Sequence, residues 1–323
     1  MNDKLIHIAV ASNHNYARGL NATLVSIVKA TSDKRRLRFH VFDDGLEASD
    51  RNELQMLVKR FGYTQPIDFR SPDLQQVLSN LDTYHGAQTA YIRLFFPELL
   101  PDLDWVLWTD VDVLWFRDPS LLWDMQDANV SVLWSRDVRS TCIVAKKMSK
   151  WRPDRDVMHY ACSGVMLMNL RKMRATNFIK TAMDFLAKWG SPCFADQDVL
   201  NEVCYEDSKF VDDRWDCMYP TNGIENGVVI HFNCIGPYFK DTKVRRFFPL
   251  FEIWFRFYAE VINGESGAAV ASWWKRALYN VIAACYPLSR LLAPITDHIQ
   301  PWTSDLIQRM FFFAWLRKKK LWK

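Results

Sequence analysis

Two aspartates, Asp110 and Asp112, directly follow an apolar run at 105–109. In an extended chain, residues i and i+2 point to the same face, so we expect the two carboxylates to converge on one point. In α/β sheets, ligands bind at the carboxyl ends of the strands. Paired carboxylates at such an end suit a hard divalent cation that also binds phosphate oxygens. The spacing therefore predicts a metal and phosphate site at these two residues.

A histidine, His231, lies near the end of a second apolar run, at 228–232. Taken alone, it is either a core histidine with a satisfied hydrogen bond or a metal ligand. If it joins the two aspartates, its imidazole favours Mn²⁺ over Mg²⁺, because nitrogen is a softer donor than oxygen.

Polar side chains in two other segments have types that suit a nucleotide or a sugar. Asn13, Asn15 and Tyr16 follow the first apolar run of the chain and form either an ordinary capped loop or a cradle for a nucleoside. Asp196 and Gln197 precede an apolar stretch. Asp196 is either a helix cap or, together with Gln197, a ligand for sugar hydroxyls.

The elements that position these residues follow from the apolar periodicity. Alternation with period two, or a short buried run, indicates a strand, and recurrence every three to four residues indicates a helix. Strands are predicted at 6–12, 36–42, 66–69, 105–109, 130–136 and 164–169, and helices at 17–30, 48–61, 88–97 and 175–189. This alternation predicts a parallel-type α/β sheet. We expect a catalytic domain at 1–248 and a helical, basic and aromatic region at 249–323.

The composition is that of a globular protein. Of 323 residues, 49% are hydrophobic and 24% charged, which excludes a disordered or low-complexity chain. The seven cysteines form no CxxC pair and no zinc spacing, so we expect buried free thiols in a reducing compartment. The first residues lack a secretory signal, and no stretch reaches the roughly 18 apolar residues of a membrane span. These features predict a cytoplasmic protein.

The segment 271–323 is basic, with nine Lys and Arg against two acidic residues, although the net charge of the chain is only +4. An apolar, aromatic run at 310–316 leads into four basic residues at 317–320. This pattern is typical of a helix that lies on an anionic lipid surface. The alternative is a helix packed on the core with a solvated basic end. We expect peripheral association with the inner face of the cytoplasmic membrane and no nucleic-acid partner.

In their order along the chain, these motifs resemble glycosyltransferase family 8, the retaining galactosyl- and glucosyltransferases that include lipopolysaccharide-core enzymes. The resemblance covers about residues 5–240. The segments that carry it are 8–16, Tyr91-Ile92-Arg93-Leu94, 106–112, 162–170, Asp196-Gln197-Asp198 and His231-Phe232.

The resemblance implies a GT-A fold, which is a single Rossmann-like α/β domain with a mixed central sheet. It implies that Asp110, Asp112 and His231 bind Mn²⁺ (or Mg²⁺) at the diphosphate of a UDP-hexose donor. The nucleotide-sugar contacts that it carries over are Ala11, Asn13, Asn15, Tyr16, Arg93, Asp110, Cys162, Gly236 and Lys240. The catalytic candidates that it carries over are Gln197, Asp196 and Asp137.

Three positions depart from the family pattern. Asn13 replaces an acidic residue, and its amide can still hydrogen-bond a base. Cys162 replaces Asn or Asp, which removes a polar contact to the sugar. The stretch after His231 is longer than in the family, so Lys240 is the predicted phosphate ligand and Lys243 the alternative.

The resemblance also implies retention of the anomeric configuration. Double displacement needs a carboxylate nucleophile near the anomeric carbon. The residue at the matching place is Gln197, an amide, which favours front-face attack with the UDP phosphate taking the proton. Asp196 or Asp137 as the nucleophile is the alternative.

We therefore expect a hexosyltransferase that moves galactose or glucose from a UDP-sugar to a glycan acceptor, lipid-linked as in lipopolysaccharide. Two other functions fit parts of the sequence. Asp110-Val111-Asp112-Val113 also resembles the nucleophile motif of haloacid-dehalogenase-type phosphatases, although at least three predicted strands precede it. Cys162 and the longer stretch after His231 also fit a membrane-bound pseudoenzyme that binds UDP without turnover.

Overall fold

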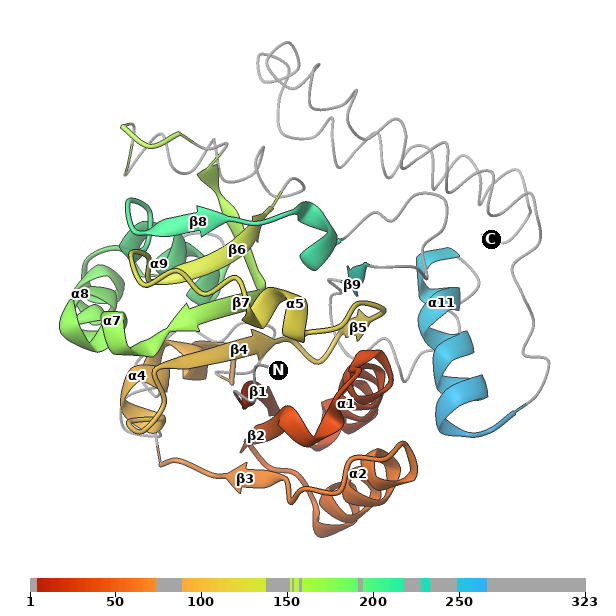
Figure 1. The fold of residues 1–323 in the computed structure, drawn as a ribbon. Coiled ribbons are helices and arrows are strands. Elements are labelled where there is room, and N and C mark those ends of the chain that lie inside the picture. Colours follow the sequence, from red (N-terminus) through yellow and green to blue (C-terminus); the bar gives the residue numbers. More distant parts are fainter. Residues whose placement is uncertain are drawn as a thin grey trace, which may run out of the picture.

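The computed structural model describes residues 5–73, 89–137, 152, 154–156, 159–190, 194–217, 228–232 and 249–265. Within them, a seven-stranded sheet has helices on both faces, and a two-stranded sheet lies beside it (Figure 1). The strands are β1 (Ile6–Ser12), β2 (Leu37–Asp43), β3 (Asp68–Arg70), β4 (Trp105–Thr109), β5 (Val113–Trp115), β6 (Val132–Arg136), β7 (Ala161–Asn169), β8 (Ser208–Phe210) and β9 (Val229–His231). The α-helices are α1 (Ala17–Ala30), α2 (Ala48–Arg60), α4 (Phe96–Leu99), α5 (Ser120–Trp123), α7 (Leu170–Ala175), α8 (Phe178–Trp189), α9 (Ala195–Val203) and α11 (Pro249–Phe257). The shorter helical turns are η1 (His14–Tyr16), η2 (Lys34–Arg36), η3 (Thr89–Phe95), η5 (Asp213–Trp215) and the π-helix η7 (Tyr258–Ile262).

The large sheet is mixed, with the order β3-β2-β1-β4-β7-β6-β8. β7 runs antiparallel to both of its neighbours, β4 and β6, while the other neighbouring pairs are parallel. The predicted strands are confirmed, and the sheet is the mixed α/β sheet that the family resemblance implied rather than a purely parallel one.

One edge of this sheet gathers the polar segments. β1 and β4 are parallel with Ala9 opposite Trp108, so Asn13 and Asp112, each four residues further on, leave the sheet at the same edge. The antiparallel β7 begins there, and the Asp110 amide donates to the Gly164 carbonyl at 2.8 Å. The loops that follow the parallel strands β1 and β4 thus meet the start of the antiparallel strand β7.

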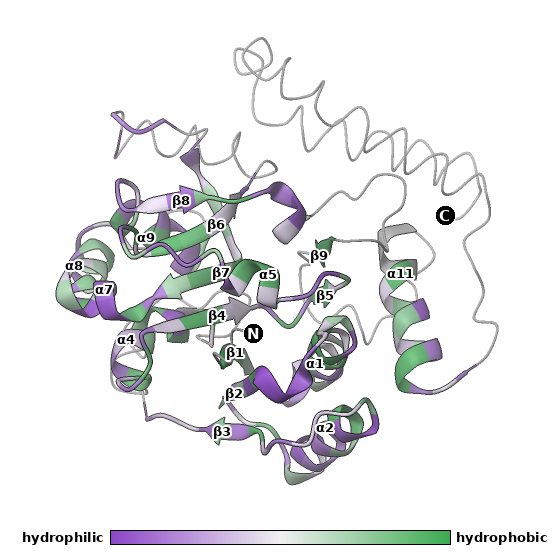
Figure 2. Cartoon of the chain, in the orientation of Figure 1, coloured by the Kyte–Doolittle hydropathy of each residue, from purple (hydrophilic) through white to green (hydrophobic). Residues whose placement is uncertain are grey.

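The sheet has one hydrophobic core on each face, because successive side chains of a strand point to opposite faces. Ile8 and Val10 of β1 point into the core formed with α1, α2, β5, β9 and α11. Ala9 and Ala11 point the other way, into the core formed with η3, α4, α7, α8 and α9. Figure 2 shows apolar residues on the helix sides that face the sheet and hydrophilic residues on their outer sides. Both faces being buried explains why these strands read as nearly continuous apolar runs.

Two predicted helices differ from the structure. The helix predicted at 88–97 is the 3₁₀ helix η3 followed by α4, and Pro97 lies inside the first turn of α4 instead of ending a helix. Proline is tolerated in a first turn because the N–H that it lacks has no helical acceptor there. The helix predicted at 175–189 begins only at Phe178, because Asn177 between α7 and α8 adopts the left-handed φ of 52°.

The small sheet depends on helix α1. β5 pairs with β9 on one side, with Val113 opposite His231. On its other side, the Thr23 hydroxyl donates to the Val113 carbonyl at 2.8 Å, and the Ser26 hydroxyl accepts from the Trp115 amide at 2.9 Å. These buried hydroxyls satisfy backbone groups that no strand pairs with, so α1 fixes the strand that follows the aspartate pair.

Residues 249–265 also pack on α1. The guanidinium of Arg18 lies 4.4 Å from the ring centroid of Tyr258, and Trp254 is buried in the same core as α1. Arg60 of α2 donates to the Val261 carbonyl at 2.7 Å. Among the described residues, no helix has the length and hydropathy that crossing a bilayer requires. The predicted basic tail lies outside the described residues.

Replacing Ser26 with alanine tests the support of β5. The Trp115 N–H would be buried without an acceptor, which costs about 1–3 kcal/mol. We expect Ser26→Ala to lower the free energy of unfolding in urea by that amount, whereas Ser49→Ala, on the exposed side of α2, changes it by less than about 0.5 kcal/mol. Equal effects of the two substitutions would contradict this role.

Candidate active site

The structure brings the three predicted metal ligands together at the edge of the sheet. One ligand atom each from Asp110, Asp112 and His231 lies within 4.8 Å of the others. His231 Nε2 is 3.3 Å from Asp112 Oδ1 and 3.9 Å from Asp110 Oδ2. The aspartates follow β4, and the histidine ends β9. Two carboxylates and one imidazole are a donor set that fits Mn²⁺.

Asp110 has one oxygen engaged by the protein and one turned to the histidine. Its Oδ1 accepts from Arg93 Nη2 at 2.8 Å and from Trp108 Nε1 at 3.1 Å. This arrangement fixes the carboxylate and leaves Oδ2 on the side of His231. Burial raises the pKa of Asp110, and the nearby Arg93 charge counteracts that rise.

His231 is surrounded by negative charge. Burial alone would lower its pKa, but Asp216 and Asp112 outweigh burial and raise the pKa of His231 well above its usual value. An imidazole nitrogen that faces carboxylate oxygens needs either a proton or a cation between them. The negative charge around the imidazole is thus compatible with a proton on the ring or with a bound cation.

A second polar group lies beside Asp110, where the sequence predicted the sugar-binding and catalytic residues. Gln197 Nε2 donates to Asp137 Oδ2 at 2.9 Å, and Gln197 Oε1 accepts from the Ser163 amide at 3.1 Å. Asp137 follows β6, and Gln197 lies in the first turn of α9. Both ends of the Gln197 amide are thus held by buried groups, and its orientation is set.

Asp196 faces Arg93 instead of capping its helix. Its Oδ2 lies 3.2 Å from Arg93 Nε, yet among the described residues this buried oxygen has no hydrogen-bond donor. The capping interpretation of Asp196 is wrong, because Phe194 is the N-cap of α9 and Asp196 lies inside the first turn of the helix. At this helix end, Asp198 accepts from the Phe194 amide at 2.8 Å. Burial raises the pKa of Asp196 to about 7, against the opposing effect of Arg93. Its Oδ2 can therefore accept a hydrogen bond from the hydroxyl group of a ligand.

The loop after β1 lies beside the metal ligands. Burial and the charge of Asp112 raise the pKa of Tyr16, which places the phenol near that carboxylate. Asn13 Oδ1 is buried and has no hydrogen-bond partner among the described residues. Ala11 is buried in β1, and Asn15 lies in η1. An unpaired amide oxygen and an aromatic ring fit an N–H-bearing planar base.

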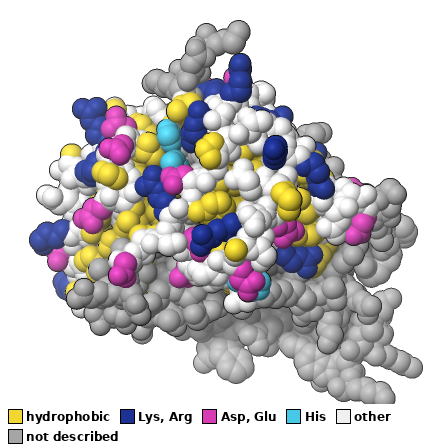
Figure 3. Space-filling view, turned by 90° about the horizontal axis from the view of Figure 1, so that it is seen from below, with side chains coloured by type: hydrophobic (Ala, Val, Ile, Leu, Met, Phe, Trp, Pro, Cys, Tyr) yellow, Lys and Arg dark blue, Asp and Glu magenta, His cyan; other side chains and the backbone are white. Residues whose placement is uncertain are grey.

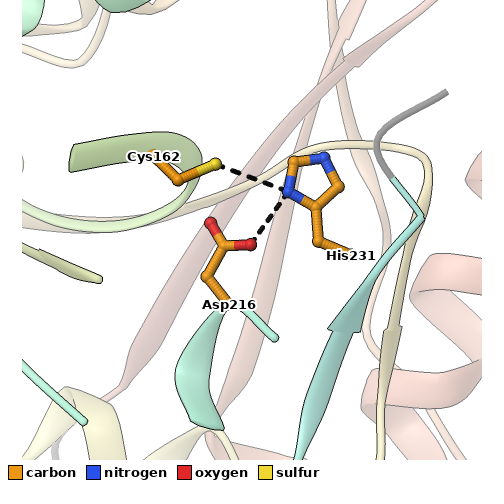
Figure 4. Close-up of side chains that lie close together, drawn as sticks. All are labelled: Cys162, Asp216 and His231. Carbon is orange, nitrogen blue, oxygen red and sulfur yellow. Dashed lines mark hydrogen bonds and ion pairs between the residues drawn. The ribbon is translucent and has the colours of Figure 1, made fainter. Parts of the chain in front are cut away.

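Cys162 turns its sulfur toward the His231 ring, as Figure 4 shows. Its Sγ is 3.6 Å from His231 Nδ1, and the side chain is fully buried. Burial raises the pKa of this thiol, so it stays protonated. Gly236 and Lys240, the remaining predicted nucleotide contacts, and Lys243 lie outside the described residues.

Sequence reasoning missed two residues of this site. Asp216 Oδ1 is 2.8 Å from His231 Nδ1. A Cβ added at Gly164 would lie 2.3 Å from His231 Cε1, so only glycine leaves room for the ring. The glycine had a signal in the sequence, since glycine inside a strand often marks a close approach. Asp216 had none, because it lies in no motif.

Comparison with known proteins gives this geometry its context. Residues 7–238 match the family model Glycosyl transferase family 8. The chain belongs to glycosyltransferase family 8. It is therefore a glycosyltransferase, which replaces the phosphatase alternative.

Relatives support the assignment. The family 8 chain is 26% identical over 221 residues to general stress protein A of Bacillus subtilis, covering 67% of this chain and 75% of the relative. It is 25% identical over 231 residues to lipopolysaccharide 1,3-galactosyltransferase of Salmonella typhimurium, covering 67% and 64%. With glucoside xylosyltransferase 1 of Danio rerio it shares 30% identity over 184 residues, covering 54% and 43%. It thus spans less than two thirds of the latter two relatives.

A solved structure supports the fold. The galactosyltransferase LgtC, in complex with donor and acceptor sugar analogues, superposes with a TM-score of 0.63 at 22% identity, covering 84% of this chain and 99% of LgtC. The predicted GT-A-type α/β fold is thereby confirmed.

The raised pKa of Asp196 predicts a pH dependence of stability. Between pH 4 and 7 the folded carboxyl keeps a proton that the unfolded chain has lost, so stability falls as pH rises through about 7. Asp196→Asn removes this term. From pH 5 to pH 8, we expect the free energy of unfolding in urea to decline less in the variant than in the wild type, by up to about 3 kcal/mol. Parallel pH profiles would show that Asp196 is already ionised at pH 5.

Proposed function

We propose that this family 8 enzyme transfers a hexose, galactose or glucose, from a UDP-sugar to a glycan acceptor with retention of configuration. The observation that carries the proposal is the meeting of Asp110, Asp112 and His231 beside the Gln197–Asp137 pair. Groups that would bind a divalent cation and a sugar lie side by side, which supports a sugar diphosphate as the donor.

The three ligands would hold Mn²⁺, or Mg²⁺, against the diphosphate of the donor. When bound, the cation stabilises the charge that develops on the leaving phosphate. Asn13 supports a uracil at the other end of the donor, because its unpaired Oδ1 can accept from a ring N–H. Tyr16 lies near Asp112, so a base that stacks on its ring would be next to the proposed metal ligands.

The sugar would lie among Arg93, Asp196, Asp137 and Gln197. Asp196 Oδ2 is buried, pairs with the Arg93 charge and has no hydrogen-bond donor among the described residues, so it can accept from a sugar hydroxyl. Gln197 is an amide held at both ends, so it is a poor nucleophile. These contacts support front-face attack, in which the acceptor hydroxyl enters on the side that UDP leaves and gives its proton to the phosphate. Asp196 or Asp137 as a nucleophile is the alternative that a trapped covalent adduct would reveal.

A lipid-linked acceptor is the second part of the proposal, and it places the enzyme at the inner face of the cytoplasmic membrane. It is supported by the relative named for lipopolysaccharide and by the basic, aromatic sequence at 302–323. On the face seen in Figure 3, basic and acidic side chains of the described residues are interspersed. A mixed surface of this kind attracts an anionic membrane weakly, so the predicted C-terminal region 249–323 would supply the contact.

Donor hydrolysis without acceptor tests the activity. We expect slow UDP release from one member of a panel of UDP-galactose, UDP-glucose and UDP-xylose in the presence of Mn²⁺. Asp112→Ala and His231→Ala should lower the rate at least 100-fold, because each removes a metal ligand. Asp184→Asn, an exposed carboxylate on α8, is the matched control and should leave the rate unchanged.

Two other results have a clear meaning. UDP binding by calorimetry without release from any donor would favour an obligate acceptor or the pseudoenzyme. Absence of UDP binding would overturn the proposed function.

Vesicle sedimentation tests the membrane contact. Replacing the four basic residues 317–320 with glutamine should lower binding to phosphatidylglycerol vesicles at least 100-fold, at about 1 kcal/mol for each basic residue. The double control Lys180→Gln and Lys188→Gln, on α8, should bind as the wild type does. Wild-type protein that stays in the supernatant with anionic vesicles would rule out this contact.

A further inference from the structure

Asp216 faces Nδ1 of the proposed metal ligand His231 (Figure 4). The other ring nitrogen, Nε2, is the one that lies close to Asp110 and Asp112. Its side chain is fully buried, and its Oδ1 is 2.8 Å from His231 Nδ1. The residue follows η5, and it lies beside His231 because the next residue, Cys217, pairs with Ile230 of β9. None of the motifs that led to the site includes it.

Both oxygens of this carboxylate are engaged. Oδ1 faces the imidazole, and Oδ2 accepts from the Val165 amide at 3.2 Å. Val165 lies on β7 opposite Thr109, the residue just before Asp110. The two donors face different oxygens, so an asparagine in this orientation would turn its NH2 group, itself a donor, toward one of them. The two contacts therefore call for a carboxylate.

The backbone holds Asp216 in place beside β9. The amide of the next residue, Cys217, donates to the Val229 carbonyl at 2.8 Å. The His231 amide donates to the Cys217 carbonyl at 3.1 Å. The strand that carries the histidine and the segment that carries the carboxylate are thus fixed to each other.

The imidazole has little freedom to turn elsewhere. Gly164 lies against Cε1 and Nδ1, where even a methyl group would collide with the ring. The other neighbour of Nδ1 is Cys162 Sγ at 3.6 Å, and a thiol is only a weak acceptor. A carboxylate at 2.8 Å therefore decides which nitrogen carries the proton. With the proton on Nδ1, the lone pair of Nε2 points to Asp112 and Asp110.

We propose that Asp216 is a positioning residue for the metal site, which accepts the Nδ1 proton of His231 and so presents Nε2 to the cation. This inference rests on the proposed function, since it assumes that a divalent cation binds at the three ligands. Carboxylates behind metal-bound histidines fix the tautomer and the ring orientation, and their loss typically weakens metal binding about 10- to 100-fold.

The experiment is a Mn²⁺ titration followed by electron paramagnetic resonance, in the presence of UDP. We expect Asp216→Ala to weaken Mn²⁺ binding about 10- to 100-fold. UDP release from the donor should fall at low Mn²⁺ and recover at saturating Mn²⁺. Asp213→Asn, an exposed carboxylate three residues away in η5, is the matched control and should bind Mn²⁺ as the wild type does.

A double-mutant cycle separates a positioning role from a structural one. If Asp216 acts through the histidine, Asp216→Ala should have no further effect on Mn²⁺ affinity once His231→Ala is present. If Asp216→Ala does not fold, Asp216→Asn carries the same test, because its NH2 group would face one of the two donors. Unchanged Mn²⁺ affinity in the folded variant, or an equal loss in the two backgrounds, would overturn the proposal.

Failure of the proposed function has a different signature. In that case the wild-type protein itself would bind neither Mn²⁺ nor UDP. Wild-type binding together with normal binding by the Asp216 variant would overturn only the positioning role.

Discussion

The structure depends on holding several carboxylates around one buried imidazole. Asp110, Asp112 and Asp216 all lie within about 4 Å of His231, at a place where burial makes each negative charge costly. Positive charge close to these carboxylates lowers the cost of burying them. The protein supplies part of that charge through Arg93, which pairs with Asp110 Oδ1. The remainder is what a divalent cation would provide.

The strand pairings of the fold bring these carboxylates and His231 together. Parallel β1 and β4 bring two loops to one edge, and the antiparallel β7 starts there with a glycine that leaves room for the histidine ring. The small sheet pairs Val113 with His231, so the strand after the aspartates carries the histidine beside it. Helix α1 completes the other edge of β5 with buried hydroxyls. A change in any of these elements would move the ligands relative to one another.

Beside the carboxylates and His231 lie several polar side chains whose oxygens are buried, some of them without a hydrogen-bond donor among the described residues. Gln197 is held by Asp137 and Ser163, while the buried oxygens Asn13 Oδ1 and Asp196 Oδ2 lack donors among the described residues. Buried acceptors without partners cost stability, and they are retained where a ligand supplies the missing donors. Asn13 follows β1 and Asp196 lies in the first turn of α9, and two separate acceptors of this kind fit a ligand with a base at one end and hydroxyl groups at the other.

The sequence alone determined the strands, most helices, the family and the candidate metal ligands, because these depend on local periodicity and on short motifs with fixed spacing. It also predicted Gln197, Asp137 and Asp196 near the site, although it left Asp196 open between cap and ligand. Only the tertiary structure decided that question and revealed Asp216 and the tight contact of Gly164 with the histidine ring. The physical reason is distance along the chain. Asp216 approaches the aspartates only when β9 pairs with β5, and no periodicity within a segment records contacts between segments so far apart.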